Sequence, residues 1–490
     1  MNNDVKSITI VGGGTAGLIS ALILQYKFSQ NISFKVVCSS KIGIIGVGEG
    51  STEHWEDFLK FVRIEPYDVI RQCGATLKSG IYFENWNDKD YFHNVSTPYD
   101  ITWGQERIAY AKLISEQKNP LELFQKYFLL NKVNSNHLNN QTTPTRQFHF
   151  NTQLLNDFLV KTCKERGIEV IDDEIEDVLI NEKGEIDKLK GVKSDYKSDF
   201  YIDCTGFKRL LISKLGAKWQ SYSKYLKLKS AIVFPTEDTE NYNMYTTAKA
   251  LKYGWRFNIP VWGRHGNGYI FDSDYINADQ AKEEVEKDLN RSVDVAKVIN
   301  FDPGALDKVW IKNCLAIGLS ANFLEPLHAT SIGSVISQVM LFTYYYFNYN
   351  QKTIDNFNDK ANKNMIMMRD FICLHYNVKK NDSQFWIDLQ NVELPDTLKD
   401  KLSVWQDRFP IADDFTDNDY QLFFDQHWSN VLSAMEIPNR DTIRQELESM
   451  SQNDVNWIRD KVNNFTNLIN NEGANAVGHK SYLQNIRSNI

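Results

Sequence analysis

The chain has 490 residues, of which 42% are hydrophobic and 24% are charged, and its formal net charge at pH 7 is −8. This acidic balance argues against nucleic acid or an anionic membrane as a partner, because both attract a basic surface. The six cysteines are scattered and form no C-x-x-C pair. That spacing favours neither a zinc site nor a disulfide framework, and it indicates reduced thiols in an intracellular protein.

Two further features bear on the compartment. No apolar run approaches the ~18 residues that cross a bilayer. The first predicted strand begins within a few residues of the N-terminus, which leaves no room for a signal peptide. We therefore expect a soluble, cytoplasmic protein without a membrane partner. The length allows two or three compact units, and the sequence does not decide between a monomer and a homo-oligomer.

Residues 7–37 predict a strand, a glycine turn, a helix and a second strand, written SITIV, GGGTAG, LISALILQYKFS and FKVVC. The apolar spacing changes from a continuous run to helical spacing at the glycines. The middle third mixes strands with helices, and the pattern beyond about residue 335 is mainly helical. We expect an α/β fold, with a nucleotide-binding core and an interleaved β-rich layer over residues 1–340. A helical region over residues 341–490 would bind or cover the substrate.

The glycine turn supplies Gly12, Gly14 and Gly17 in G-x-G-x-x-G spacing, with Thr15 and Ala16 between the last two. The first glycine permits the tight turn, the second lets a pyrophosphate approach the backbone, and the third lets helix and strand pack closely. Unpaired N–H groups at the helix N-terminus would face the phosphates. A strand before the motif and a helix after it favour a dinucleotide site over a purely structural turn.

The carboxylate that usually follows the second strand and holds the ribose is missing. The sequence there is FKVVCSSK, so Cys38 or Ser39 takes its place, and Ser39 can donate only a weaker hydrogen bond. We therefore expect a cofactor that exchanges readily. A second segment, DFYIDCTGFKRLL, ends an apolar strand at Asp203 and turns at Gly206. It either returns to the cofactor or is an ordinary strand with a Thr-Gly turn.

Four more stretches follow in order: IGVGEGSTEHW, CGATLKSGIYFENW, GWRFNIPVWG and GLSANFLEPLHATSIG. With the earlier motifs they resemble the flavin-dependent halogenases, the tryptophan-halogenase branch especially, over roughly the first 340 residues. The likeness continues weakly at FFDQHWSNVLSAMEIP. It implies a Rossmann-type FAD-binding core of the flavin monooxygenase kind, and FADH2 supplied by a separate flavin reductase. Besides Ser39 and the glycine turn, the flavin-binding residues that it implies are Val47, Gly48, Glu49, Asp203, Gly206, Gly318 and Leu324.

Lys78, in GATLK, is the residue to which the resemblance assigns the chemistry. On its own, a lysine in an apolar stretch is usually a surface residue whose ammonium reaches water. In the family, reduced flavin, oxygen and halide yield hypohalous acid, which travels to a buried lysine. An ammonium can donate a hydrogen bond to hypohalous acid and polarise it, and a desolvated amine can form a haloamine. Arginine could not do the second.

The segment EPLHATSIG departs from the family pattern EPLEST, because His328 stands where the family has a glutamate near the lysine. A neutral imidazole can accept the proton that an aromatic ring loses after electrophilic attack. Unlike glutamate it does not offset the charge of Lys78, so we expect the amine to be neutral more often. The alternative is a packed histidine without a catalytic part. In the family, the backbone N–H groups at the positions of Thr330 and Ser331 bind halide, which suits turn amides ahead of a helix.

The segment GWRFNIP corresponds to the family signature WxWxIP, with Phe257 at the position of the second tryptophan. In the family this segment separates flavin from substrate, and phenylalanine keeps a smaller apolar wall. An ordinary aromatic strand explains the residues equally well.

The predicted function is an FADH2-dependent halogenase that acts on an electron-rich aromatic of the indole or phenol type. Chloride, bromide and iodide are all candidate halides, and the altered site predicts a preference for bromide or iodide, which oxidise more readily. Trp86, Phe424 and Trp428 are candidates to stack on the substrate, although core packing is an equal explanation. Two alternatives stay open: a flavin-dependent aromatic hydroxylase, and a flavin-binding homologue without activity.

Overall fold

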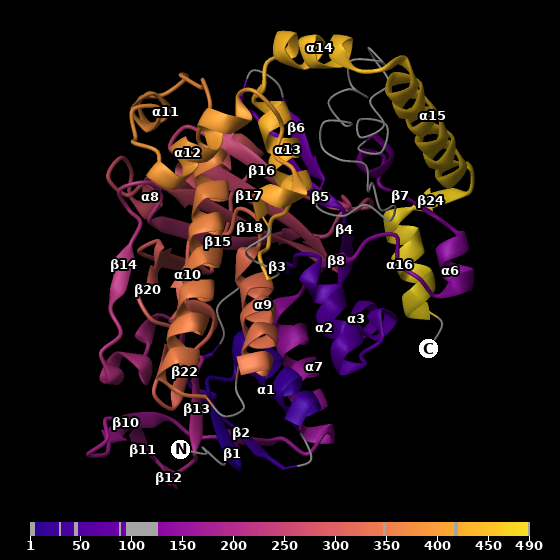
Figure 1. Cartoon of the computed structure of the whole chain (residues 1–490). Helices are drawn as coiled ribbons and strands as arrows, with labels where there is room; N and C mark the ends of the chain where they lie inside the picture. Colours follow the sequence, from indigo (N-terminus) through magenta and orange to yellow (C-terminus); the bar gives the residue numbers. More distant parts are fainter. Residues whose placement is uncertain are drawn as a thin grey trace.

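The structure is a computed structural model that describes residues 5–28, 31–43, 48–87, 90–94, 126–345, 349–415 and 420–488. Strands and helices alternate through the first part of the chain, and the remainder is almost entirely helical, as the sequence predicted. Figure 1 shows a sheet with the N-terminus at one end of the molecule, a larger sheet across its middle, and C-terminal helices at the opposite end.

A six-stranded sheet carries the predicted glycine turn. In order across the sheet, its strands are β21 (Trp310–Ile311), β22 (Cys314–Ala316), β13 (Phe200–Asp203), β1 (Ser7–Val11), β2 (Ser33–Cys38) and β9 (Glu169–Asp172). The last five strands are parallel. Carboxyl ends of parallel strands meet at one edge, so the turns after β1, β2, β13 and β22 share that edge, where α/β sheets bind their ligands.

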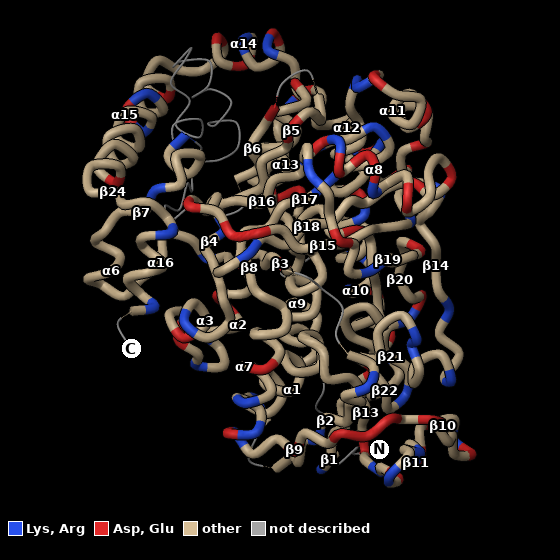
Figure 2. Tube along the Cα trace, turned by 180° about the vertical axis from the view of Figure 1, so that it is seen from behind, with Lys and Arg blue, Asp and Glu red and all other residues tan. Residues whose placement is uncertain are grey.

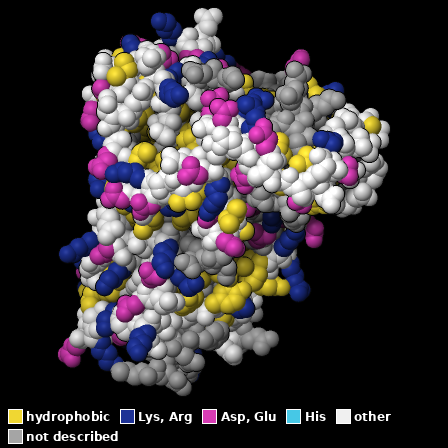
Figure 3. Space-filling view, turned by 45° about the horizontal axis from the view of Figure 1, so that its top comes forward, with side chains coloured by type: hydrophobic (Ala, Val, Ile, Leu, Met, Phe, Trp, Pro, Cys, Tyr) yellow, Lys and Arg dark blue, Asp and Glu magenta, His cyan; other side chains and the backbone are white. Residues whose placement is uncertain are grey.

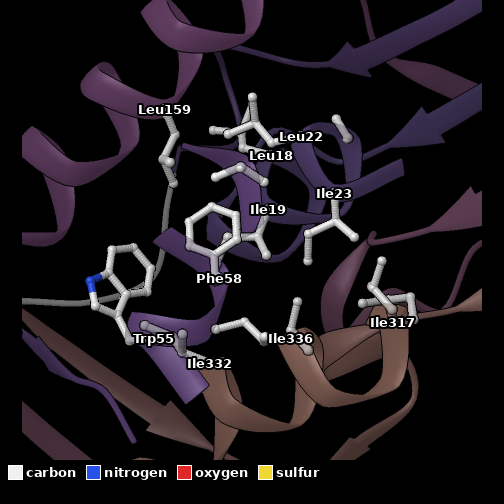
Figure 4. Packing of buried hydrophobic residues seen from close by; sticks show 14 of the residues in the cluster. Leu18, Ile19, Leu22, Ile23, Trp55, Phe58, Leu159, Ile317, Ile332 and Ile336 are labelled. Atoms are coloured by element: carbon white, nitrogen blue, oxygen red, sulfur yellow. The ribbon is translucent and has the colours of Figure 1, made fainter. Parts of the chain in front are cut away.

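Four helices pack together beside this sheet: α1 (Thr15–Phe28), α2 (His54–Val62), α7 (Thr152–Glu165) and α9 (Thr330–Tyr345). Figure 4 shows side chains of α1 surrounded by residues of the other three helices, among them Leu18, Ile19, Phe58, Leu159, Ile332 and Ile336. Each buried side chain of this size contributes about 1.5–3 kcal/mol. Because α1 begins at the glycine turn and α9 begins at the EPLHATS turn, this packing holds the two turns in a fixed relation.

A seven-stranded sheet forms the predicted β-rich layer. Its strands, in order, are β19 (Lys297–Asn300), β15 (Ser230–Glu237), β18 (Arg264–Phe271), β17 (Gly254–Val261), β16 (Tyr245–Leu251), β5 (Gly80–Glu84) and β6 (Tyr91–Asn94). All neighbours are antiparallel except β16 and β5. Beside it lies a small sheet of β3 (Glu49–Gly50), β8 (Gln147–Phe150) and β4 (Thr76–Lys78). Only Ser79 separates β4 from β5, so Lys78 lies at the junction of the two sheets.

The C-terminal helices are integrated with the core. They are α10 (Gln351–Leu374), α11 (Gln384–Leu389), α12 (Asp396–Trp405), α13 (Asp425–Ala434), α14 (Arg440–Ser449), α15 (Gln452–Ala474) and α16 (His479–Ser488). Helix α10 contacts α9, and α13 contacts β6. The predicted boundary at residue 340 lies inside α9, and residues of α10 to α13 share one apolar cluster with the seven-stranded sheet.

The remaining elements are peripheral to the site. They are α3 (Pro66–Gln72), α6 (Asn136–Asn140), α8 (Ala278–Leu289), β7 (Lys132–Asn134), β10 (Ile175–Ile180), β11 (Ile186–Gly191), β12 (Asp195–Tyr196), β14 (Trp219–Ser221), β20 (Gly304–Leu306), β23 (Asn322–Phe323) and β24 (Ala476–Gly478). Strand β24 pairs with β7, so the end of the chain returns to its middle.

Both signs of charge are interspersed along the trace in Figure 2. On the face shown in Figure 3, apolar side chains lie in patches between charged and polar ones. None of the described helices combines the length and apolar character that a membrane span requires.

The glycine turn makes a matched test of packing. A Cβ atom on Gly17 would lie 1.9 Å from the carbonyl oxygen of Gly12, whereas a Cβ on Gly14 would meet nothing within 4 Å. Gly17→Ala should therefore lower the free energy of unfolding by about 1–3 kcal/mol. Gly14→Ala should stay within about 1 kcal/mol of the wild type. Urea unfolding of the two variants measures this, and equal losses would contradict the close helix–strand approach.

Candidate active site

The glycine turn has the shape that a dinucleotide phosphate needs. Gly12 has φ +119°, and a Cβ there would lie 2.2 Å from the carbonyl oxygen of Cys204, so the turn requires glycine. Gly14 borders open space at the N-terminus of α1, whose first residues are Thr15 and Ala16. An approachable backbone and the unpaired N–H groups of a helix start fit the pyrophosphate of FAD.

The turn after β2 carries no carboxylate, as the sequence predicted. Ser39 follows the strand, and its hydroxyl accepts a hydrogen bond from the backbone N–H of Lys41 at 3.3 Å. Cys38 packs against Gly13, where a Cβ would lie 2.6 Å from the sulfur. The neighbouring strand β9 ends in Asp172, whose carboxylate accepts from the backbone N–H of Ser40 at 2.8 Å. The nearest carboxylate therefore holds the loop itself, and sequence spacing did not reveal this pairing.

Asp203, at the end of β13, is fully buried, and its carboxylate accepts hydrogen bonds from this chain's own groups. The donors are the N–H and hydroxyl of Thr205, the hydroxyl of Ser320, and the backbone N–H groups of Leu211 and Ile212, at 2.7–3.1 Å. The carboxylate thus ties the DCTG turn to the GLS turn.

The GLS turn in its turn touches the glycine turn. Gly318 has φ +65°, and a Cβ there would lie 2.8 Å from the Cβ of Ala16. Gly206, in the DCTG turn, has φ +68° and accepts a hydrogen bond from Ser320 through its carbonyl oxygen. Leu324 is buried in the apolar cluster of the seven-stranded sheet. The structure therefore brings the predicted flavin-site turns together at one sheet edge.

Lys78 is 1% exposed, which excludes the surface interpretation. Its ammonium donates a hydrogen bond to the carbonyl oxygen of Ser51 at 2.7 Å. A Cβ built on Gly50 would lie 3.4 Å from Lys78 Nζ and 3.5 Å from the Cβ of Ala329. The strap that contains Gly50 and Ser51 therefore passes between the lysine and the EPLHATS turn.

The strap itself begins with the predicted flavin-binding residues. Val47 lies outside the described residues, whereas Gly48 is buried and packs toward Gly266, with 3.5 Å between a Cβ there and the Gly266 Cα. Glu49 opens β3, and burial raises the pKa of its carboxyl to about 7. The strap is thus a buried segment whose single carboxyl group holds a proton at neutral pH about half of the time.

Burial lowers the pKa of Lys78 to about 7, in the direction that the sequence predicted. Three histidines, His93, His149 and His328, are close enough for the lysine charge to lower the pKa of each. Burial is the larger cause of the lowered pKa at all three, so they are neutral near pH 7. The amine is therefore close to balance between its protonated and free forms.

The EPLHATS turn leads directly into α9. Ala329 has φ +52°, a left-handed conformation that is uncommon for residues other than glycine, and its N–H donates to the carbonyl oxygen of Pro326 at 3.0 Å. Helix α9 then begins at Thr330, followed by Ser331, and runs for 16 residues. The first N–H groups of a helix have no partner within it and carry partial positive charge. This turn fits a halide.

His328 is also buried, at 1% exposure, and joins a set of histidines that sequence reasoning missed. Its Nε2 lies 2.8 Å from Nε2 of His375 on α10, and its Nδ1 has no hydrogen-bond partner among the described residues. The ring of His93, on β6, lies 4.7 Å from that of His328, and the ring of His427, on α13, lies 5.7 Å from that of His93. No sequence motif links these positions, since three separate elements bring them together.

Glu325, in the same turn, was not singled out by the sequence. It is buried and accepts a hydrogen bond from the hydroxyl of Tyr376 at 2.6 Å. Burial raises the pKa of Glu325 to about 8, so it is mainly a neutral acid at pH 7. This carboxyl therefore adds little negative charge near Lys78.

The three predicted substrate-stacking residues lie in different settings. Trp86 is fully buried and donates from Nε1 to the carbonyl oxygen of Ala248 at 2.8 Å. Trp428 is fully buried with its ring 5.0 Å from Phe371. Phe424 is half-buried and precedes α13. Full burial makes the two tryptophans part of the packed wall, and of the three only Phe424 keeps appreciable exposure.

Phe257 lies on the central strand β17 and is 8% exposed. Its ring covers Gly268 of β18, where a Cβ would lie 2.4 Å from the ring. The segment is thus a tightly packed strand of the larger sheet.

The tryptophan halogenase family model matches residues 7–450. The chain belongs to this family. It is 30% identical over 441 residues to the 7-chloro-L-tryptophan 6-halogenase KtzR of Kutzneria sp. (strain 744), an alignment that covers 82% of this chain and 85% of the relative. This protein is therefore an enzyme, a flavin-dependent halogenase that uses FAD and halide, as its motifs predicted.

Two solved structures show the same fold as this halogenase. The tryptophan halogenase of Shewanella frigidimarina NCIMB 400 superposes with a TM-score of 0.90 at 23% identity, covering 99% of this chain and 98% of that one. Xcc4156, a flavin-dependent halogenase of Xanthomonas campestris, superposes with a TM-score of 0.86 at 26% identity over 98% of each chain. The Rossmann-type FAD-binding core and the helical C-terminal region are thus confirmed.

The halogenase should lose stability at low pH through Lys78. Below about pH 7 the ammonium is charged in both states, and the folded state bears the full cost of burying it, on the order of 3–5 kcal/mol. As the pH rises from about 7 toward the ordinary pKa of 10.5, the folded state loses this proton first and the cost diminishes. Lys78→Met should therefore stabilise the protein more at pH 6 than at pH 9.5.

Urea unfolding at both pH values measures this difference in the free energy of unfolding. Lys132→Met, on the exposed start of β7, is the control. A stability difference between Lys78→Met and wild type that stays constant with pH would contradict the lowered pKa.

Proposed function

We propose that this halogenase uses FADH2, O2 and halide to form hypohalous acid, and that Lys78 transfers the halogen to an electron-rich aromatic substrate of the indole or phenol type. The indole class is supported by the matched relatives, whose names give tryptophan or chlorotryptophan as the substrate. FADH2 is expected from a separate flavin reductase. The turn after β2, which lacks a ribose-binding carboxylate, suits a cofactor that arrives and leaves by diffusion.

The residues proposed to hold FAD are the glycine turn with the N-terminus of α1, the strap of Gly48 and Glu49, and the DCTG and GLS turns tied together by Asp203. When bound, the reduced flavin supplies the two electrons with which O2, halide and a proton become hypohalous acid and water. The backbone N–H groups of Thr330 and Ser331 hold the halide beforehand, because a helix start favours an anion. Each of these groups belongs to a turn that packing fixes in place.

Lys78 polarises the hypohalous acid. Its ammonium donates a hydrogen bond to the oxygen, and the aromatic carbon attacks the halogen. The oxygen–halogen bond breaks, and the oxygen takes the lysine proton to leave as water. In the free-amine form, Lys78 instead exchanges a proton for the halogen, giving a haloamine and water. A pKa near 7 makes both forms available at neutral pH.

His328 completes the substitution. Electrophilic attack leaves a cationic ring that carries both the halogen and the original proton at one carbon. The unpartnered Nδ1 of His328 accepts that proton, which restores aromaticity. The proton then returns to the Lys78 amine or to solvent, so the net reaction of hypohalous acid with the aromatic gives aryl halide and water. The observation that carries the proposal is the buried Lys78 ammonium beside the helix start at Thr330.

The first test supplies FADH2 and air with each halide in turn, and reads a panel of indoles and phenols by mass spectrometry. Lys78→Ala should lose halogenated product by at least about 100-fold, comparable to the loss of a catalytic acid or base, while FADH2 oxidation continues. Lys78→Arg is the matched variant: it keeps the hydrogen-bonding cation and cannot form a haloamine. Activity in Lys78→Arg favours the ammonium route, and its loss favours the haloamine route.

Two outcomes of this assay would contradict the proposal. Hydroxylated product would indicate a flavin-dependent aromatic hydroxylase. Equal yields of halogenated product with wild type and Lys78→Ala would indicate free hypohalous acid that escapes the site.

Halide preference is a separate prediction. Without a fully charged carboxylate beside Lys78, the electrophile receives less activation, so bromide and iodide should give higher product yields than chloride. Parallel assays at equal halide concentration measure the three yields. His328→Glu, which restores the family residue, should raise the relative yield with chloride. Chloride as the best halide of the wild type would overturn this prediction.

A further inference from the structure

We propose that His375, on α10, is a positioning residue that holds His328 as the tautomer with a free lone pair on Nδ1, the atom that accepts the substrate proton. This inference rests on the proposed function of His328, and it concerns the hydrogen-bond chain behind that residue. The chain runs from His328 to His375 and ends at the backbone carbonyl of Phe371.

The direction of each hydrogen bond follows from its far end. The carbonyl oxygen of Phe371 can only accept, so His375 Nδ1, 2.8 Å away, must carry the hydrogen. Burial lowers the pKa of His375 to about 3, so its ring is neutral and its Nε2 holds a bare lone pair. His328 must then donate from its own Nε2, 2.8 Å from that lone pair. In a neutral imidazole the remaining nitrogen, Nδ1, is left as an acceptor.

The end of α10 supplies the fixed point of this chain. Within a helix, the carbonyl of Phe371 would accept from the backbone N–H of His375, four residues later. That N–H instead donates to the carbonyl of Ile372 at 3.1 Å, as often happens where a helix tightens at its last turn. The Phe371 carbonyl is thereby free to accept from the His375 ring. The tautomer of His328 is thus set by where α10 ends.

The surroundings leave the task to His375. The titratable groups near His328 are His93 on β6, His427 on α13, Lys78 on β4 and His375 itself. None of these is an anion, whereas a serine-protease triad orients its histidine with a carboxylate. The rings of Phe83, Phe371 and Phe423 lie within 6 Å of the His328 ring. Within the described part of the chain, the listed acceptor for His328 Nε2 is therefore the neutral lone pair of His375.

Simple packing does not account for this arrangement. A buried polar atom without a partner costs about 1–3 kcal/mol, and His328 Nδ1 is such an atom within the described residues. A purely structural histidine pair would satisfy both outer nitrogens, whereas here only the Phe371 end is satisfied. The open end is the one that the proposed chemistry uses.

Two amide substitutions of His375 separate the two ends of the chain. In His375→Gln the side-chain oxygen can occupy the place of Nε2 and still accept from His328. In His375→Asn the shorter amide can still donate to the Phe371 carbonyl, but it does not reach His328. We expect the rate of halogenated product formation to fall about 10-fold or more in His375→Asn, part of the contribution of a general base. His375→Gln should stay within about threefold of wild type.

The pH profile and a double variant distinguish positioning from a structural role. Losing the acceptor makes the His328 cation less stable, so the acidic limb of the product-formation rate should move to lower pH in His375→Asn and stay in place in His375→Gln. The variant His328→Gln/His375→Asn should lose no more activity than His328→Gln alone. Equal losses in the Asn and Gln variants, or additive losses in the double variant, would overturn the inference.

A third measurement does not depend on activity. In protein labelled with 15N-histidine, the His328 signals, assigned by their loss in His328→Gln, should show a bare Nδ1 and a protonated Nε2 in wild type. The reverse tautomer would overturn the inference even if the enzyme halogenates. If the tautomer is as expected but wild type yields no halogenated product with any halide, the proposed function fails and the hydrogen-bond chain stands.

Discussion

The rest of the active site depends on the burial of one ammonium group. Lys78 lies at the junction of two sheets, with a single backbone carbonyl as its hydrogen-bond acceptor. Removing a cation from water is costly unless it is paired, and here the lowered pKa shows that the cost is only partly offset. The site therefore maintains a lysine that is ready to give up its proton. That property is what transfer of an electrophilic halogen requires of it.

The surrounding groups preserve this balance because they are neutral. Histidine replaces the family glutamate at position 328, burial keeps the nearby histidines uncharged, and Glu325 is largely protonated. A charged carboxylate would have held the lysine proton more firmly. The anion in this site is thus expected to be the substrate halide, which meets a helix start, and the field at Lys78 changes as that halide is consumed.

Local sequence predicted the parts of the fold in which chemistry and backbone geometry coincide. The glycine turn requires Gly12 and Gly17 because a side chain at either position would collide with backbone, so the motif is legible in any context. The start of α9 at Thr330 was legible for the same reason. Other features depended on distant contacts. Asp203 proved to be bonded to this chain's own turns, the two tryptophans proved fully buried, and the helical region proved continuous with the core.

The sequence by itself determined the family, the α/β core and the two residues at the centre of the proposed chemistry, Lys78 and His328. These depend on short motifs whose residues are neighbours in the chain. The tertiary structure alone decided the electrostatic state of those residues and their partners. The pKa of Lys78 follows from how completely sheets and helices exclude water, and His328 meets His375 because α10 ends beside it. Burial and long-range contacts are properties of the packed molecule, so no local pattern records them.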